Sequence, residues 1–83
     1  MLKVFICEDE IGTLNSLTGL INNYCPGAEL CGTAQTVDDA VKKISACTID
    51  LLLLDVNFPD GTGFDILEKI EKREFKLIFI TAH

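Results

Sequence analysis

A run of four leucines followed by an aspartate, Leu51 to Asp55, constrains the fold of this chain more than any other feature. The residues around it read IDLLLLDV, so both faces of a strand formed here would be apolar. Such a strand has to be covered on both sides, which is the usual situation of a parallel strand between two layers of helices. The run therefore predicts a central, buried, parallel strand that ends on a carboxylate.

Strand-like and helix-like segments alternate along the rest of the sequence. Apolar runs predict three more strands, over residues 2–7, 28–34 and 77–82. Apolar residues at helical spacing predict helices over residues 11–24 and 36–46, and a third marked by Phe64, Leu67 and Ile70. This β-α-β-α-β-α-β order with short connections predicts one α/β domain, a doubly wound parallel sheet with helices on both faces.

Several local signals support the ends of these helices. Pro26 and Gly27 break the chain after the first helix. Thr36, with Asp39 three residues later, resembles a capping box. The segment EKIEKRE gives the third helix a solvated face, on which Glu68 and Lys72 would form a favourable i,i+4 pair.

Composition narrows the classes of function. The chain has 83 residues, is 48% hydrophobic and has only two prolines, which suits one folded domain and not a disordered segment. No apolar stretch approaches the roughly 20 residues of a membrane span, and no signal peptide is visible, so we expect a cytoplasmic protein. The net charge is −6 without any long basic run, so this segment is not expected to bind nucleic acid directly.

The cysteines do not predict a metal site. Cys7, Cys25, Cys31 and Cys47 form no C-x-x-C pair, and the one histidine is His83. We expect reduced thiols that pack as small hydrophobes, and the alternative is a disulfide such as Cys7 with Cys31 on neighbouring strands.

Carboxylates follow two of the predicted strands. The first strand ends in Glu8 and Asp9, and the third ends in Asp55. If the strands follow the 2-1-3-4 part of the flavodoxin-like order, the three carboxylates meet at the carboxyl edge of the sheet, where such folds bind ligands. Their repulsion would be costly without a cation, and oxygen ligands suit Mg²⁺ or Mn²⁺. The alternative is that each acid is a solvated loop residue.

The sequence does not match two other ligand-binding motifs, the EF-hand loop and the dinucleotide-binding fingerprint. Counted from Asp55 as an EF-hand loop, the sixth residue is Asp60 instead of glycine and the twelfth is Ile66 instead of glutamate. The GTG of Gly61 to Gly63 lacks the third glycine of a dinucleotide fingerprint. We expect these glycines to turn the chain sharply into the third helix.

The segments VFICEDE, LLLLDVNFPDGTGFDIL and IFITAH resemble the receiver domain of two-component response regulators. The resemblance covers the whole chain in order: an acid pair after the first strand, an aspartate after the third, then proline and glycine, and Thr-Ala ending the fourth. The segments DGTGFDIL and FITAH are most similar to receivers of the LytTR class, in which a DNA-binding domain follows the receiver.

The resemblance implies a role for each of five residues. Asp55 would accept a phosphoryl group from a sensor histidine kinase. Asp9 would ligate Mg²⁺ directly, with Glu8 as a second ligand or acting through water, and Asn57 would offer its backbone carbonyl. Thr81 would be the hydroxyl that moves toward the phosphoryl group, although by itself it is an ordinary β-branched strand residue. We expect phosphorylation to switch an output domain outside this chain, not enzymatic turnover.

The resemblance also predicts what the chain lacks. A receiver continues through a fourth helix, a fifth strand ending in a lysine, and a fifth helix, so residues 1–83 correspond to its N-terminal two-thirds. We expect such a piece to dimerise, to swap elements or to be marginally stable. Two alternatives remain: an interaction module that is not phosphorylated, and a phosphotransferase or hydrolase with an aspartyl-phosphate intermediate. The second is disfavoured because Asn57 stands where a dehalogenase-like enzyme has an acid.

Overall fold

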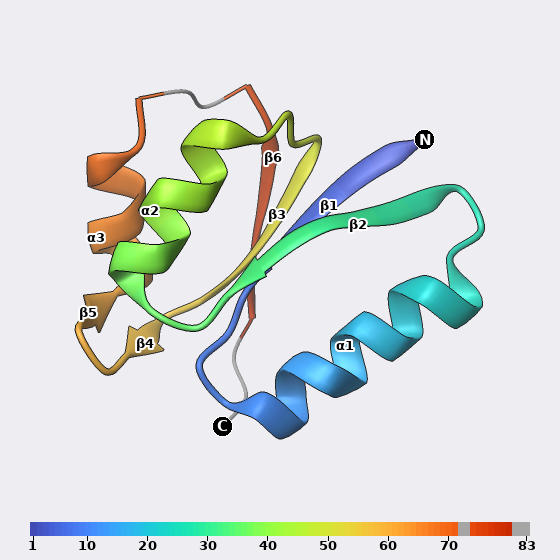
Figure 1. Ribbon diagram of the computed structural model, residues 1–83, viewed down its shortest axis with the longest axis horizontal. Coiled ribbons are helices and arrows are strands. Elements are labelled where there is room, and N and C mark those ends of the chain that lie inside the picture. The colour runs from blue at the N-terminus through green and yellow to red at the C-terminus, as the bar shows by residue number, and fades with distance from the viewer. Residues whose placement is uncertain (72–73, 81–83) are drawn as a thin grey trace.

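The computed structural model describes residues 1–71 and 74–80, and it confirms the predicted alternation of strands and helices (Figure 1). The elements are β1 (Leu2–Cys7), α1 (Ile11–Tyr24), β2 (Ala28–Ala34), α2 (Val37–Ala46), β3 (Leu51–Asp55), β4 (Asn57–Phe58), β5 (Gly61–Thr62), α3 (Gly63–Lys69) and β6 (Lys76–Ile80). The predicted strand over residues 77–82 is β6, and its last two predicted residues lie outside the described part.

The main sheet has four parallel strands in the order β2-β1-β3-β6. This is the predicted 2-1-3-4 order, with β6 as the fourth strand. The register pairs Cys7 of β1 with Leu54 of β3, so these neighbouring strands end at nearly the same level. The residues that follow them therefore meet at one edge of the sheet.

The leucine run is central, as its two apolar faces require. Leu52 and Leu54 are buried in the larger core cluster, beneath α2 and α3. Leu51 and Leu53 point the other way and pack on the smaller cluster, which α1 covers. Figure 1 shows α2 and α3 on one side of the sheet and α1 on the other.

Side-chain caps begin two of the helices. The Thr36 hydroxyl accepts a hydrogen bond from the Asp39 N–H at 3.1 Å at the start of α2. At the start of α3, Thr62 and Asp65 form a complete capping box with bonds of 3.2 and 2.8 Å. This second box has the same spacing as the predicted one but was not anticipated.

The third helix is shorter than its pattern suggests. It ends at Lys69, so the predicted solvated extension is wrong, and the proposed partner Lys72 lies outside the described residues. Phe64 was expected in the apolar stripe, but it is exposed and its ring lies 5.2 Å from that of Phe79 on β6. Leu67 and Ile70 are buried as predicted.

A small hairpin, β4 and β5, replaces the simple turn expected after β3. Phe58 packs into the larger core cluster. Gly61 has φ +156°, a conformation that side chains rarely adopt. The Asp60 carboxylate accepts hydrogen bonds from the N–H groups of Val37 and Asp38 at 2.8 and 3.0 Å. The hairpin is thereby tied to the first turn of α2.

One irregularity interrupts the pairing of β1 with β2. Val4 pairs with Leu30 and Phe5 with Gly32, which leaves Cys31 as the extra residue of a β-bulge. A Cβ on Gly32 would approach the Phe5 ring to 2.7 Å, so glycine allows the large ring to lie against β2.

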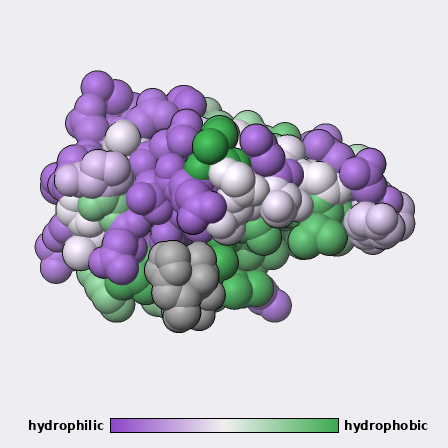
Figure 2. Space-filling model, turned by 90° about the horizontal axis from the view of Figure 1, so that it is seen from below, coloured by the Kyte–Doolittle hydropathy of each residue, from purple (hydrophilic) through white to green (hydrophobic). Residues whose placement is uncertain are grey.

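The strand β6 forms an exposed edge of the sheet. Leu77, Ile78 and Phe79 are all substantially exposed, in contrast to the buried β3 beside them. Figure 2 shows hydrophobic surface along the lower part of its view, below a mostly hydrophilic upper left.

Among the described residues, none of the helices has the length and apolar character of a membrane-spanning segment.

Candidate functional site

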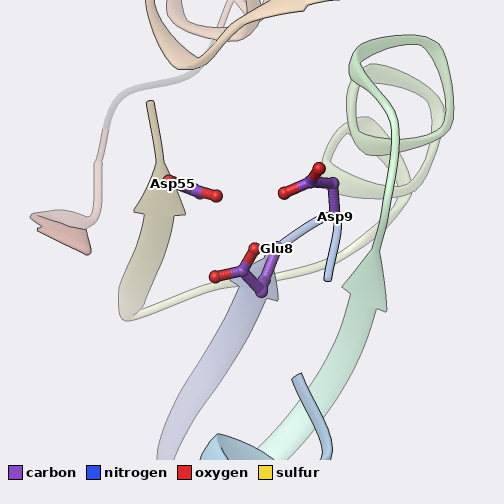
Figure 3. A group of neighbouring side chains, drawn as sticks. All are labelled: Glu8, Asp9 and Asp55. Carbon is purple, nitrogen blue, oxygen red and sulfur yellow. The ribbon is translucent and has the colours of Figure 1, made fainter. Parts of the chain in front are cut away.

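Three carboxylates meet at the carboxyl edge of the sheet, as predicted. Glu8 and Asp9 follow β1 directly, and Asp55 is the last residue of β3. The Glu8 N–H donates to the Ala34 carbonyl at 3.0 Å, which continues the pairing with β2 and fixes the backbone at this point. Figure 3 shows the three side chains gathered around one space between the ends of the two strands.

The geometry is tight for groups of like charge. One carboxylate oxygen from each of the three residues lies within 4.8 Å of the others. Glu8 is only 1% exposed and Asp55 8% exposed, whereas Asp9 lies on the surface. The site therefore has a buried floor and one open side.

Glu8 is the least satisfied group of the site. Its Oε2 accepts a hydrogen bond from the Glu10 N–H at 3.1 Å, but its buried Oε1 has no partner among the described residues. Burial, followed by the neighbouring carboxyls of Asp55 and Asp9, raises the pKa of Glu8 from 4.5 to about 7, although the Glu10 bond opposes this. The site favours a proton or another positive charge here.

The position of Asp55 is set by contacts close in sequence. Its Oδ1 accepts a hydrogen bond from the Val56 N–H at 2.7 Å. The Gly63 N–H donates to the Val56 carbonyl at 2.8 Å, and a Cβ on Gly63 would collide with the Asp55 carbonyl oxygen. The glycine thus lets the start of α3 lie directly against the end of β3.

The donor set fits a hard divalent cation. All three side chains offer oxygen, and the buried Oε1 of Glu8 has no hydrogen-bond partner among the described residues. Mg²⁺ takes few protein carboxylates and keeps several waters, which suits an open-sided group of this size. Glu8, Asp9 and Asp55 could therefore hold Mg²⁺ or Mn²⁺.

Of the two remaining predicted site residues, the structure describes only Asn57. Asn57 lies two residues after Asp55, at the start of β4, and is exposed. Thr81 lies outside the described residues. Sequence reasoning missed Asp60 as the link to α2 and gave Gly63 only a turning role; the proline and glycine pattern around them was the available signal.

Comparison with known proteins gives one consistent result. The family model described as the response regulator receiver domain matches residues 4–83. The chain is 33% identical over 84 residues to a sensory transduction protein LytR of Staphylococcus haemolyticus, covering 99% of this chain and 32% of that protein. It is 29% identical over 85 residues to a sensory transduction protein LytT of Bacillus cereus, covering 100% of this chain and 34% of that protein. The chain thus spans about a third of these relatives.

Solved structures agree. The response regulator MaeR bound to beryllium trifluoride matches with a TM-score of 0.86 and 27% identity, over 100% of this chain and 69% of that one. The response regulator TrrA in complex with the histidine kinase ThkA gives a match with a TM-score of 0.82 and 27% identity, over 99% of this chain and 70% of the matched one. The resemblance seen in the sequence is confirmed: the chain belongs to the response regulator receiver domain family of two-component systems.

Proposed function

We propose that Asp55 is the phosphoryl acceptor of this receiver. The observation that carries the proposal is that a nearly buried Asp55 lies beside the carboxylates of Glu8 and Asp9. The buried Oε1 of Glu8 has no hydrogen-bond partner among the described residues. The donor would be a phosphohistidine of a sensor histidine kinase. TrrA, a structural relative, forms a complex with such a kinase, which supports this class of partner.

The transfer needs an oriented carboxylate and charge neutralisation more than covalent help from the protein. The Val56 N–H holds Oδ1 of Asp55, so Oδ2 is the oxygen that attacks phosphorus. The new O–P bond forms as the donor P–N bond breaks, and the electron pair leaves with the imidazole nitrogen. A divalent cation bound by Glu8 and Asp9 would neutralise charge on the phosphoryl oxygens.

The remaining assignments follow from family membership. The Asn57 backbone carbonyl would complete the cation site, and the Thr81 hydroxyl would move toward the phosphoryl group. Phosphorylation adds about −1.5 to −2 in charge by analogy with other phospho-residues, enough to draw a hydroxyl and its loop inward. Residues 1–83 would be the N-terminal two-thirds of a cytoplasmic receiver whose output domain, DNA-binding as in the LytTR class, lies elsewhere in the protein.

Intact mass spectrometry tests the proposal. The chain is incubated with Mg²⁺ and acetyl phosphate, and we expect a mass gain of one phosphoryl group that EDTA prevents. Asp55→Ala should abolish the gain, whereas Asp38→Ala, an exposed aspartate on α2, should keep it. A gain that survives Asp55→Ala contradicts the assignment. No gain favours an interaction module, and rapid release of phosphate over many turnovers favours an enzyme.

A further inference from the structure

The carboxylates of the candidate cation site come from the ends of two strands. Glu8 and Asp9 follow β1, whereas Asp55 ends β3. The loops that follow these two strands are both bonded to the segment that leads from β2 into α2. We infer that Asp60 is a positioning residue for the cation site, because it ties the loop after Asp55 to the segment that the other loop contacts. The inference rests on the proposed function, in which the carboxylates bind a cation during phosphoryl transfer.

The first loop is held through its backbone. The segment over residues 34–38, which we call the β2–α2 junction, contacts both acids that follow β1. The Ala34 carbonyl accepts a hydrogen bond from the Glu8 N–H at 3.0 Å. The Gln35 side chain donates from Nε2 to the Asp9 carbonyl at 3.3 Å. The backbone of these two acids is therefore placed relative to the junction.

Asp60 holds the second loop to the same junction. It lies between β4 and β5, and its two carboxylate oxygens accept the N–H groups of Val37 and Asp38 at 2.8 and 3.0 Å. The first N–H groups of a helix have no partner within the helix, so the carboxylate satisfies two of them. The approach is close, since a Cβ on Gly61 would lie 3.2 Å from the Val37 side chain. Figure 1 shows the hairpin beside the start of α2.

The hairpin is in turn bonded to the residues beside the proposed phosphoryl acceptor. Asn57 pairs with Thr62 across the hairpin, and the Gly63 N–H donates to the Val56 carbonyl at 2.8 Å. The Val56 N–H donates to Oδ1 of Asp55 at 2.7 Å. A shift of the hairpin away from the junction would therefore move Asp55 relative to the other two carboxylates. Mg²⁺ demands near-ideal geometry of its oxygen ligands, so such a shift should weaken its binding.

The role of Asp60 goes beyond starting the helix, because α2 already has its own cap. The Thr36 hydroxyl accepts a hydrogen bond from the Asp39 N–H at 3.1 Å, and Asp38 and Asp39 supply negative charge in the first turn. What the two bonds from Asp60 add is the attachment of the hairpin to the junction.

Isothermal titration calorimetry of the 83-residue chain with Mg²⁺ tests the inference. We expect Asp60→Ala to raise the dissociation constant for Mg²⁺ about tenfold, as is typical when a group that orients metal ligands is removed. With acetyl phosphate as donor, the Mg²⁺ concentration for half-maximal phosphorylation should rise by a similar factor. In EDTA, without any metal, the Gly63 amide should exchange its hydrogen faster in the variant than in the unmodified chain.

Three further variants separate positioning from charge and from stability. Asp60→Asn loses the charge but keeps one acceptor oxygen, so it should weaken Mg²⁺ binding only about threefold. Asp38→Ala removes a neighbouring exposed charge while its backbone N–H stays, and should bind Mg²⁺ like the unmodified chain. Ile44→Val, at a buried residue near the other end of α2, should lower the urea midpoint without changing Mg²⁺ affinity.

Each possible failure has its own meaning. Unchanged Mg²⁺ affinity in Asp60→Ala overturns the inference, and if that variant is too unstable to measure, unchanged affinity in Asp60→Asn does so. Equal weakening by Asp38→Ala, or Asp60→Asn as weak as Asp60→Ala, would assign the effect to charge and also overturn it. Equal weakening by Ile44→Val would assign it to stability. An unmodified chain that binds no Mg²⁺ contradicts the proposed function itself as well as the inference.

Discussion

Glu8 shows how one residue can be costly for stability and useful for binding. It is a buried carboxylate with one oxygen left without a donor, beside two other acids. Removing its charge should therefore stabilise the fold when no cation is present. We expect Glu8→Gln to raise the free energy of unfolding by about 1–2 kcal/mol at pH 8 in EDTA, measured by urea denaturation. In Mg²⁺ the unmodified chain should gain stability and the variant should not.

The pH dependence of this effect has a definite sign. Because the folded-state pKa of Glu8 is raised from 4.5 to about 7, folding favours its protonated form. That contribution is fully present below about pH 4.5 and is lost as pH rises through 7. The advantage of Glu8→Gln should thus disappear near pH 5. Glu10→Gln, an exposed neighbour whose side chain makes none of these contacts, should be neutral at both pH values; a similar gain there would contradict the explanation.

Gly63 is a position at which close backbone packing leaves no room for a side chain. A Cβ at this position would collide with the Asp55 carbonyl oxygen and lie 3.1 Å from the Leu54 side chain. We expect Gly63→Ala to lower the free energy of unfolding by about 2–3 kcal/mol and to slow phosphorylation of Asp55. Gly27→Ala is the matched control, since a Cβ there meets nothing within 4 Å. Equal urea midpoints for the two variants would contradict the steric argument.

The sequence could locate the acidic residues but not describe their environment. Glu8, Asp9 and Asp55 were placed together because parallel strands end at one edge, a rule that needs only the order of elements. The missing donor at Glu8 and the close approach of Gly63 depend on side-chain and backbone positions to within an ångström. No pattern of letters carries that information.

Among the elements, the contact between Asp60 and α2 makes the clearest prediction. The carboxylate accepts from two N–H groups of the first turn of α2, and these bonds hold the pKa of Asp60 below its ordinary value. We expect Asp60→Ala to lower the urea midpoint and to speed hydrogen exchange in the first turn of α2.

The size of this effect should depend on pH. A depressed pKa means that the stabilisation is present above the ordinary value of 3.8 and is lost as pH falls through the lowered folded-state value. The difference between the two proteins should therefore shrink in acid. Asp38→Ala, which removes only an exposed pair with Lys42 at 3.0 Å, is the control and should leave exchange nearly unchanged.

Prediction of elements succeeded where periodicity is strong and failed where tertiary contacts decide. The second strand was recovered with its observed bounds, and the leucine run lies in β3, which is shorter than the predicted segment IDLLLLDV. The end of α3 was misjudged because the charged segment after Lys69 continues the helical spacing, yet Ile70 already has an extended backbone. The bulge at Cys31 is set by pairing with β1, which is distant in sequence, so local pattern could not show it. The β4–β5 hairpin pairs residues close in sequence, but its two-residue strands are too short to give an alternating pattern.

At the scale of the whole molecule, the exposed edge of β6 predicts self-association. Among the described residues no strand lies beyond the outer edge of β6, and an open edge with exposed Leu77, Ile78 and Phe79 is a template for pairing with a second copy. We expect the 83-residue chain to show a mass that rises with concentration in light scattering. Ile78→Lys should keep it monomeric, while Leu20→Lys on α1, at a residue with the same 52% exposure, should not. A monomer at all concentrations would contradict this.

The place of β1 in the sheet has a consequence for the order in which the chain folds. β1 comes first in the sequence but lies between β2 and β3. Asp9 and Asp55 are 46 residues apart (55 − 9), so their meeting closes a long loop and requires β3 to be in place. During synthesis the carboxylate cluster therefore cannot form before β3 has been made. A cation that needs all three carboxylates would bind only chains that have reached this stage, and would draw the folding equilibrium toward them.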